Sequence, residues 1–150
     1  MQRRIVPGVI DGQQQLCSLP PRATVLEAAA LMRERRVAAV LVLDAGRLRG
    51  IVTERDIVFR VVAAGLPIDT TAVSAVMTAD PETLAPDDTA MAALQKMQAG
   101  HYRHLPVLRG DEVCGVVSIR DIYESVRQTL QDELAQTEAM IYGSQYSVNG

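Results

Sequence analysis

Aromatic residues are scarce in this chain, which has no Trp, one Phe and four Tyr among 150 residues. Its hydrophobic content is nevertheless 48%, so its core has to be built mainly from aliphatic side chains. Proteins that hold single-stranded nucleic acid stack the bases on aromatic rings, and few such rings are present. The formal net charge of −3 at pH 7 also argues against a protein whose main task is to neutralise a phosphate backbone. Nucleic acid is therefore disfavoured as a partner.

Cysteine is rare too: Cys17 and Cys114 stand in unrelated contexts, without the paired spacing of a zinc site. This usage is typical of a reducing compartment. Arg3 and Arg4 precede an apolar stretch that Pro7 interrupts, so no signal-peptide core forms. No apolar run approaches the roughly 18–20 residues that span a bilayer. We expect a soluble, cytoplasmic protein with no membrane partner.

Motifs of catalysis are missing as well. The sequence has no Gly-x-Ser-x-Gly elbow, no Walker loop and no His-Glu-x-x-His helix. His101 and His104 are close in sequence, but no carboxylate or cysteine lies beside them, so a metal site there is the weaker interpretation. We predict that the protein is not an enzyme and that it requires no cofactor or metal.

What the sequence does have is an internal repeat. Residues 50–57 (GIVTERDI) return as residues 115–122 (GVVSIRDI), at an offset of 65. The same offset pairs, without gaps, Leu19 with Leu84, Thr24 with Thr89, Met32 with Met97 and Val42 with Val107. Solenoid units recur at about 20–50 residues and need several copies, so two copies at a longer period favour a closed, pseudo-symmetric pair. A binding site would then lie between the halves.

Both copies predict the same order of elements: strand, helix, strand, strand, helix. In the first copy, Thr24 and Glu27 form a capping box that opens the first helix, and Gly65 ends the second. The predicted elements of the first copy are a helix over residues 24–35, strands over 38–43 and 48–52, and a helix over 53–64. Those of the second copy are a helix that starts at residue 88 or 89 and ends at 99, strands over 105–108 and 113–117, and a helix from Ser118.

The last helix continues far beyond the repeat and carries an apolar stripe. Its members recur at spacings of three and four: Tyr123, Val126, Leu130, Leu134, Thr137 and Ile141. The first copy has no counterpart. A helix that protrudes from a pseudo-symmetric core has to bury such a stripe, and we expect a second protomer to cover it in a homodimer. The alternative is that the helix folds back on its own chain.

A hydroxyl and a carboxylate, three residues apart, open the last helix of each copy: Thr53 with Asp56, and Ser118 with Asp121. Free first-turn amides and the helix dipole favour a phosphate there, while the carboxylate can accept hydrogen bonds from two ribose hydroxyls. This combination suits a ribonucleotide. The alternative is an ordinary capping box that needs no ligand, although capping and binding can coexist.

Basic and aromatic side chains gather in one place, over residues 101–104. Arg103 can hold a phosphate through its planar guanidinium group. The first copy has Ala38 at the equivalent position, so the two predicted sites are unequal. We expect the site that contains Ser118 and Asp121 to be the better one.

These residues resemble a tandem pair of CBS domains, the Bateman module. The resemblance covers roughly residues 16–123, with the Gly-h-x-Thr/Ser-x-x-Asp signature (h being apolar) intact in both copies. It extends to small bacterial proteins that consist of a CBS pair alone. It implies an α/β (α+β) fold of two pseudo-symmetric β-α-β-β-α repeats packed through their sheets, with an extended C-terminal helix. The expected division is an N-terminal segment (1–15), repeat 1 (16–66), a linker (67–81), repeat 2 (82–123) and a C-terminal helix and tail (124–150).

The resemblance also implies a regulatory function without catalysis. Such proteins bind adenosine-containing ligands between the repeats, commonly AMP, ADP or ATP and less often S-adenosylmethionine or NAD(H). By position, Ser118 would contact phosphate or a ribose hydroxyl, Asp121 ribose, Arg103 phosphate, and Val37 the base. Thr53 and Asp56 would form the second site, with Tyr102 opposite. Family members also pair as flat dimers.

Two functions of different kinds follow from the sequence. The first is a homodimeric sensor that binds an adenine nucleotide and regulates an unidentified protein. The second is a ligand-free, dimeric interaction scaffold in which the same hydroxyl and carboxylate residues serve only as helix caps.

Overall fold

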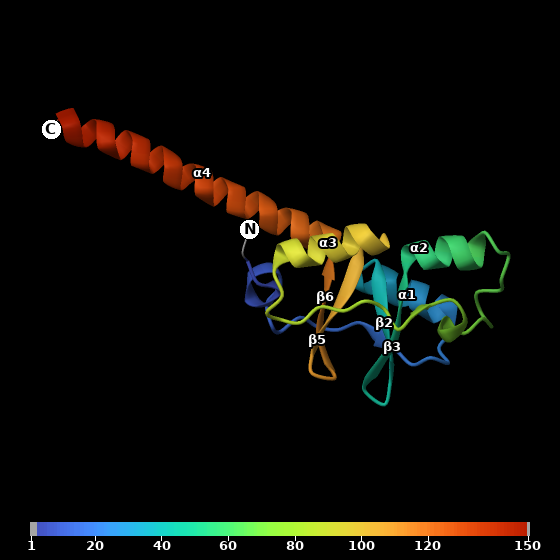
Figure 1. Ribbon diagram of the computed structural model, residues 1–150. Coiled ribbons are helices and arrows are strands. Elements are labelled where there is room, and N and C mark those ends of the chain that lie inside the picture. The colour runs from blue at the N-terminus through green and yellow to red at the C-terminus, as the bar shows by residue number, and fades with distance from the viewer. Residues whose placement is uncertain (1–2, 150) are drawn as a thin grey trace.

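The protein folds into two similar halves, each with helices against a small sheet, followed by one long helix (Figure 1). The structure, a computed structural model, describes residues 3–149 and the side chains of residues 3–142. No helix in this described part is long and apolar enough to cross a membrane.

The sheet of the first half has four strands in the order β1-β2-β3-β4. They span β1 (Ser18–Leu19), β2 (Ala39–Asp44), β3 (Arg47–Thr53) and β4 (Thr78–Ala79). β1 runs parallel to β2, and the other neighbours are antiparallel. Helix α1 (Val25–Arg35) starts at the predicted capping box, in which the Glu27 N–H donates to Thr24 Oγ1 at 3.2 Å. The predicted helix and strands of this copy are confirmed to within a residue or so.

The second half repeats this architecture with α3 (Ala90–Gly100), β5 (His104–Arg109) and β6 (Glu112–Ser118). Even its irregularities recur at the 65-residue offset. The β2–β3 register shifts between Val42 and Leu43, and the β5–β6 register shifts between Val107 and Leu108. The first strand of this half is reduced to one parallel bridge, between Leu84 and Val107.

The helix predicted over residues 53–64 is divided into two parts. Helix α2 (Glu54–Ile57) continues directly into a wider helical turn, η2 (Val58–Val62). In this turn the Ala63 N–H donates to the Val58 carbonyl at 2.9 Å, five residues back. Gly65 follows with a φ of +69°, which confirms the predicted glycine end of this helix.

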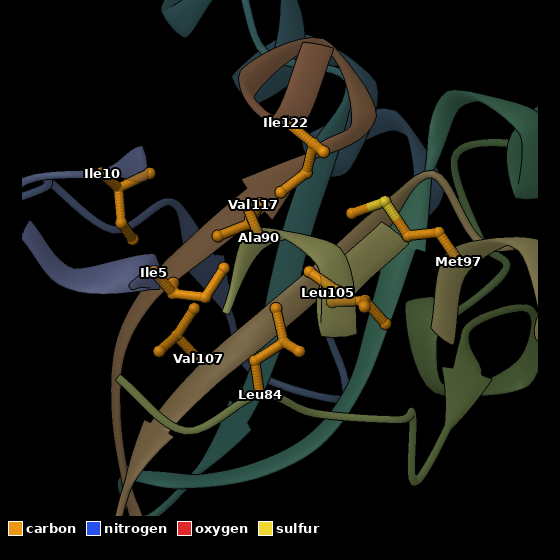
Figure 2. Close-up of a cluster of buried hydrophobic side chains, with 10 residues drawn as sticks. Ile5, Ile10, Leu84, Ala90, Met97, Leu105, Val107, Val117 and Ile122 are labelled. Carbon is orange, nitrogen blue, oxygen red and sulfur yellow. The ribbon is translucent and has the colours of Figure 1, made fainter. Parts of the chain in front are cut away.

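The segment that precedes each repeat packs on the other repeat. The N-terminal segment contains the turn η1 (Ile5–Val9), and its Ile5 N–H donates to the Asp88 carbonyl at 2.8 Å. Ile5 and Ile10 enter the core of the second half beside Leu105 and Ile122 (Figure 2). Conversely, the segment between the repeats contains η3 (Val73–Ala75), whose Val73 is fully buried in the core of the first half.

A separate apolar cluster joins the two sheets. Leu41 and Ile51 of the first half pack with Val113 of the second, and Leu16 and Leu108 border them. Strands β3 and β6 therefore lie against each other at the centre of the molecule, as the predicted packing through the sheets requires.

Helix α4 (Ile119–Asn149) starts on the second half and then leaves the body of the protein (Figure 1). Its first turns are anchored by Ile122, which is fully buried, and by Val126, which is partly buried on the same core. Beyond Leu130 every described side chain is exposed. The extended C-terminal helix of the sequence prediction is confirmed.

Candidate ligand-binding cleft

A cleft of about 780 Å³ lies between the two halves and is lined by residues of both. Three pairs of repeat-equivalent residues line it: Ala38 and Arg103, Ala39 and His104, and Glu54 and Ile119. Because both members of each pair contribute, the pseudo-symmetry relates the two walls of the cleft. The sequence placed a binding site between the halves, and the structure has a cavity there.

Ser118 and Asp121 meet in this cleft at the start of α4. The Ser118 N–H donates to Asp121 Oδ2 at 2.8 Å, and the Asp121 N–H donates to Ser118 Oγ at 3.1 Å. This reciprocal pair is the capping-box geometry. Within the described residues, Asp121 Oδ1 accepts no hydrogen bond, so one carboxylate oxygen is left for a ligand hydroxyl.

Arg103 and Val37 also line the cleft. The carbonyl of Arg103 accepts the Ile119 N–H at 2.8 Å, which fixes Arg103 next to the start of α4. Val37 comes from the other half and directly follows Arg36, which closes α1 in the left-handed conformation at φ 55°. The structure thus brings together four predicted site residues: Ser118, Asp121, Arg103 and Val37.

Three other predicted site residues, Thr53, Asp56 and Tyr102, do not line this cleft. The Thr53 N–H donates to Asp56 Oδ2 at 3.0 Å in a second capping box. The other oxygen, Oδ1, accepts from Thr78 Oγ1 at 3.4 Å and lies 3.8 Å from Arg60 Nε. With its side chain only 12% exposed, Asp56 is occupied by groups of its own chain.

Tyr102 serves the core of the second half. Its ring packs against that apolar cluster and covers Gly100, where an added Cβ would clash with the ring. Its N–H donates to the Met97 carbonyl at 2.9 Å and closes α3. A second binding site formed by Thr53, Asp56 and Tyr102 stays a prediction.

The cleft carries an excess of positive charge. Four arginines line it, namely Arg33, Arg36, Arg103 and Arg120, against two carboxylates, Glu54 and Asp121. None of the four makes an ion pair with any described residue. In a chain of net charge −3, this cluster favours an anionic ligand.

His104 also lines the cleft, near three charged groups. Burial lowers the pKa of its imidazole below the ordinary value of 6.5, and Arg103 lowers it further, whereas Glu54 and Asp121 raise it. The neutral ring therefore persists to lower pH than in an exposed histidine. No group of three or more His, Cys, Asp or Glu side chains in the described residues is placed to hold a metal ion.

Sequence reasoning did not predict four charged residues of the cleft: Arg33, Arg36, Arg120 and Glu54. Arg33 and Arg36 lie at the end of α1, on a wall that forms only when the halves pack together. Glu54 directly follows the predicted site residue Thr53, and Arg120 lies between Ser118 and Asp121, so their position within the two motifs was the available signal.

Comparison with known proteins places the chain in a family. The family model of the CBS domain matches residues 2–63 and 73–128. The chain is a member of the CBS-domain family. Its two matched segments correspond to the two halves of the fold, so it contains a tandem CBS pair. Proteins that consist of CBS domains are typically non-catalytic regulatory modules.

Relatives of this CBS pair occur in plants and in prokaryotes. A CBS domain-containing protein of Arabidopsis thaliana, CBSCBSPB3, is 42% identical over 111 residues, which are 73% of this chain and 20% of the relative. The chain thus spans about a fifth of that protein's length. A protein with CBS domains from Burkholderia ambifaria superimposes with a TM-score of 0.72 at 34% identity, over 77% of this chain and 84% of that one.

One structural neighbour of the CBS pair was solved with a nucleotide. The CBS domain protein PAE2072 from Pyrobaculum aerophilum, complexed with AMP, superimposes with a TM-score of 0.71 at 29% identity. The match covers 79% of this chain and 89% of that chain.

Proposed function

We propose that this CBS pair is a homodimeric sensor that binds an adenosine-containing nucleotide in the cleft between its repeats. Binding would change its shape or its affinity for a regulated protein. The observation that carries the proposal is the convergence of Ser118, Asp121 and Arg103 on one cavity. The AMP complex of a structural neighbour supports the same class of ligand.

The chemistry of the cleft divides the ligand between the two walls. Asp121 Oδ1 can accept from the ribose hydroxyls, while the Ser118 hydroxyl, whose oxygen already accepts the Asp121 N–H, can donate to a phosphate oxygen. Val37, which is apolar, would contact the base from the opposite half. Arg103 is placed to form charge-assisted hydrogen bonds with phosphate oxygens.

The arginine excess indicates a ligand with several phosphate charges. Arg33 and Arg36 lie on the wall opposite Arg103 and Arg120, so a phosphate chain can be contacted from both halves. This arrangement favours ATP or ADP over AMP. S-adenosylmethionine has no phosphate and is disfavoured, whereas NAD(H), with its diphosphate, ranks between them.

Thermal unfolding in the presence of AMP, ADP, ATP, S-adenosylmethionine and NADH, with GTP as the control, tests the proposal. A ligand at 100 times its Kd stabilises the folded state by about 2.7 kcal/mol, and a domain of this size gains roughly 2–4 °C per kcal/mol. We expect a shift with an adenine nucleotide that exceeds the shift with GTP, and its loss in Asp121→Ala.

The alternative function is a ligand-free dimeric scaffold. The capping geometry of Ser118 with Asp121 is what this alternative requires of these residues. It predicts that nucleotide-free protein shows no shift with any of these compounds. That result would overturn the sensor proposal.

A further inference from the structure

We propose that two copies of the chain pair through α4, antiparallel to each other, with the two helices crossing at Leu130. This inference deepens the homodimer proposed above by naming its contact surface and orientation. It does not depend on nucleotide binding, because no residue of the α4 stripe lines the cleft.

The apolar stripe on α4 is exposed to solvent in a single chain. The exposed fractions are 58% for Tyr123, 53% for Leu130, 60% for Leu134 and 53% for Ile141. The helix is continuous through Asn149, and Figure 1 shows its second half far from the body. Folding back on the same chain would require a break that this continuous helix lacks, so the stripe is left for another molecule.

The spacing of the stripe is symmetric about Leu130. Five of its six members, Tyr123, Val126, Leu130, Leu134 and Thr137, follow one another in steps of three, four, four and three residues, and the sixth, Ile141, lies beyond them. In an antiparallel pair related by a two-fold axis at Leu130, residues equally far before and after it lie opposite each other. Val126 therefore meets Leu134 of the partner subunit, and Tyr123 meets Thr137 of the partner subunit.

Burial of Val126 fits this register. Val126 already packs partly against the core of the second half, next to the exposed Tyr123. Leu134 of the partner subunit would extend that core outward and cover the remaining surface. The protruding half of each α4 would thus lie along the anchored half of the partner's α4, which packs on the core of the second half.

Charge selects the antiparallel orientation. After Arg127 the helix has no Lys or Arg, and its protruding half carries Glu133 and Glu138. A third carboxylate, Asp132, lies on the other face of the helix, one turn after Gln128, and pairs with Arg3 of its own chain at 3.4 Å. A parallel pair would align Glu133 and Glu138 with the same carboxylates of the partner, and like charges across a helix pair are destabilising. The anchored half carries Arg120 and Arg127 in addition to two acidic residues, so its net charge is about zero. In the antiparallel pair the acidic, protruding half of each helix therefore lies beside the neutral, anchored half of the partner's helix.

Disulfide trapping of single-cysteine substitutions tests the register. Leu130→Cys places two thiols at the crossing point, whereas in Leu134→Cys the thiols are eight residues apart along the axis, or about 12 Å, which is too far for a disulfide. Both leucines are exposed, so both variants should fold. We expect the 130–130 peptide, identified by mass spectrometry, from Leu130→Cys and no 134–134 peptide from Leu134→Cys. A mixture of Tyr123→Cys and Thr137→Cys chains should form the mixed disulfide.

The oligomeric mass provides an independent measurement. Light scattering should give twice the 16.3 kDa chain for the unmodified protein and for Gln128→Glu, a matched control on another face of α4. Leu130→Glu should give the monomer. Disulfides at both 130 and 134 would show a parallel pair and overturn the orientation. A Leu130→Glu protein that remains dimeric would overturn the surface and point to the exposed Val58, Phe59 and Val62 instead.

Discussion

The guanidinium of Arg60 lies 3.8 Å from the carboxylate of Asp56, and it also donates to the carbonyls of Val76 and Met77 at 3.1 and 2.9 Å. At the 65-residue offset, Asp121 has Ser125 in place of Arg60. The carboxylate of Asp56 is therefore held by groups of its own chain, whereas that of Asp121 faces the cleft. This difference leads to the first prediction.

Asp121→Ala should weaken nucleotide binding in the cleft, and Asp56→Ala should leave binding in that cleft unchanged. Loss of a hydrogen-bonding carboxylate corresponds to about 1.5–3 kcal/mol, or roughly ten- to a hundredfold in Kd. Asp56→Ala removes the N3 carboxylate of the capping box that Thr53 opens and should lower the free energy of unfolding by about 0.5–2 kcal/mol. Calorimetric titration with ATP measures both variants. Equal losses of affinity would show that the second site also binds.

The arginines of α1 should select for phosphate number. The double variant Arg33→Gln/Arg36→Gln should lower the affinity for ATP by about tenfold or more, because charge-assisted hydrogen bonds contribute about 1.5–3 kcal/mol. It should lower the affinity for AMP much less. Arg35→Gln is the matched control, since Arg35 is exposed on the same helix but does not line the cleft. Identical losses for AMP and ATP would place the phosphates elsewhere.

Acidification should destabilise the fold through His104. Burial lowers the pKa of this side chain in the folded state, so the unfolded chain takes up a proton near pH 6.5 while the folded chain does not. The free energy of unfolding should then fall as the pH drops below about 6.5, until the folded pKa is reached. Denaturant titrations from pH 7.5 to 5 should show a smaller decrease for His104→Gln than for His101→Asn. An unchanged slope in His104→Gln would contradict this assignment.

Ser125→Ala should stabilise the protein. The side chain is buried, at 6% exposure, and its hydroxyl has no hydrogen-bond partner in the described residues. An unsatisfied buried polar group costs about 1–3 kcal/mol, and alanine removes the hydroxyl with little loss of volume. We expect a higher Tm by calorimetry. A clear loss of stability would mean that the hydroxyl has a partner such as a buried water.

Local signals in the sequence predicted the helix starts well. The capping boxes at Thr24 and Ser118 join residues three apart, and their hydrogen bonds form in the structure as expected. The division of the helix after Ile57 was not predictable, because the residues of η2 would suit an ordinary α-helix equally well. Only the hydrogen-bond pattern distinguishes the two.

Long-range features had no comparable signal. β4 has two residues, too few for a period of two to be visible, and it exists because Thr78 pairs with Ile51 of a distant strand. The cleft walls at Arg33 and Arg36 depend on how the halves pack. The predicted division at residues 15, 66, 81 and 123 stays a prediction, as do the roles of the seven proposed site residues.

Ile5 lies in the core of the second repeat, and Val73 lies in the core of the first. The stretch of chain that is repeated in the sequence is therefore not the stretch that builds one complete core. A fragment that contains one sequence repeat alone would lack part of the apolar core of its half. The core of each half contains residues from the segment that precedes the other repeat. Unfolding of one half should therefore destabilise the other half. A ligand that binds in the cleft therefore acts on one cooperative folding unit. Relative motion of the two halves requires the segments that they exchange to move as well.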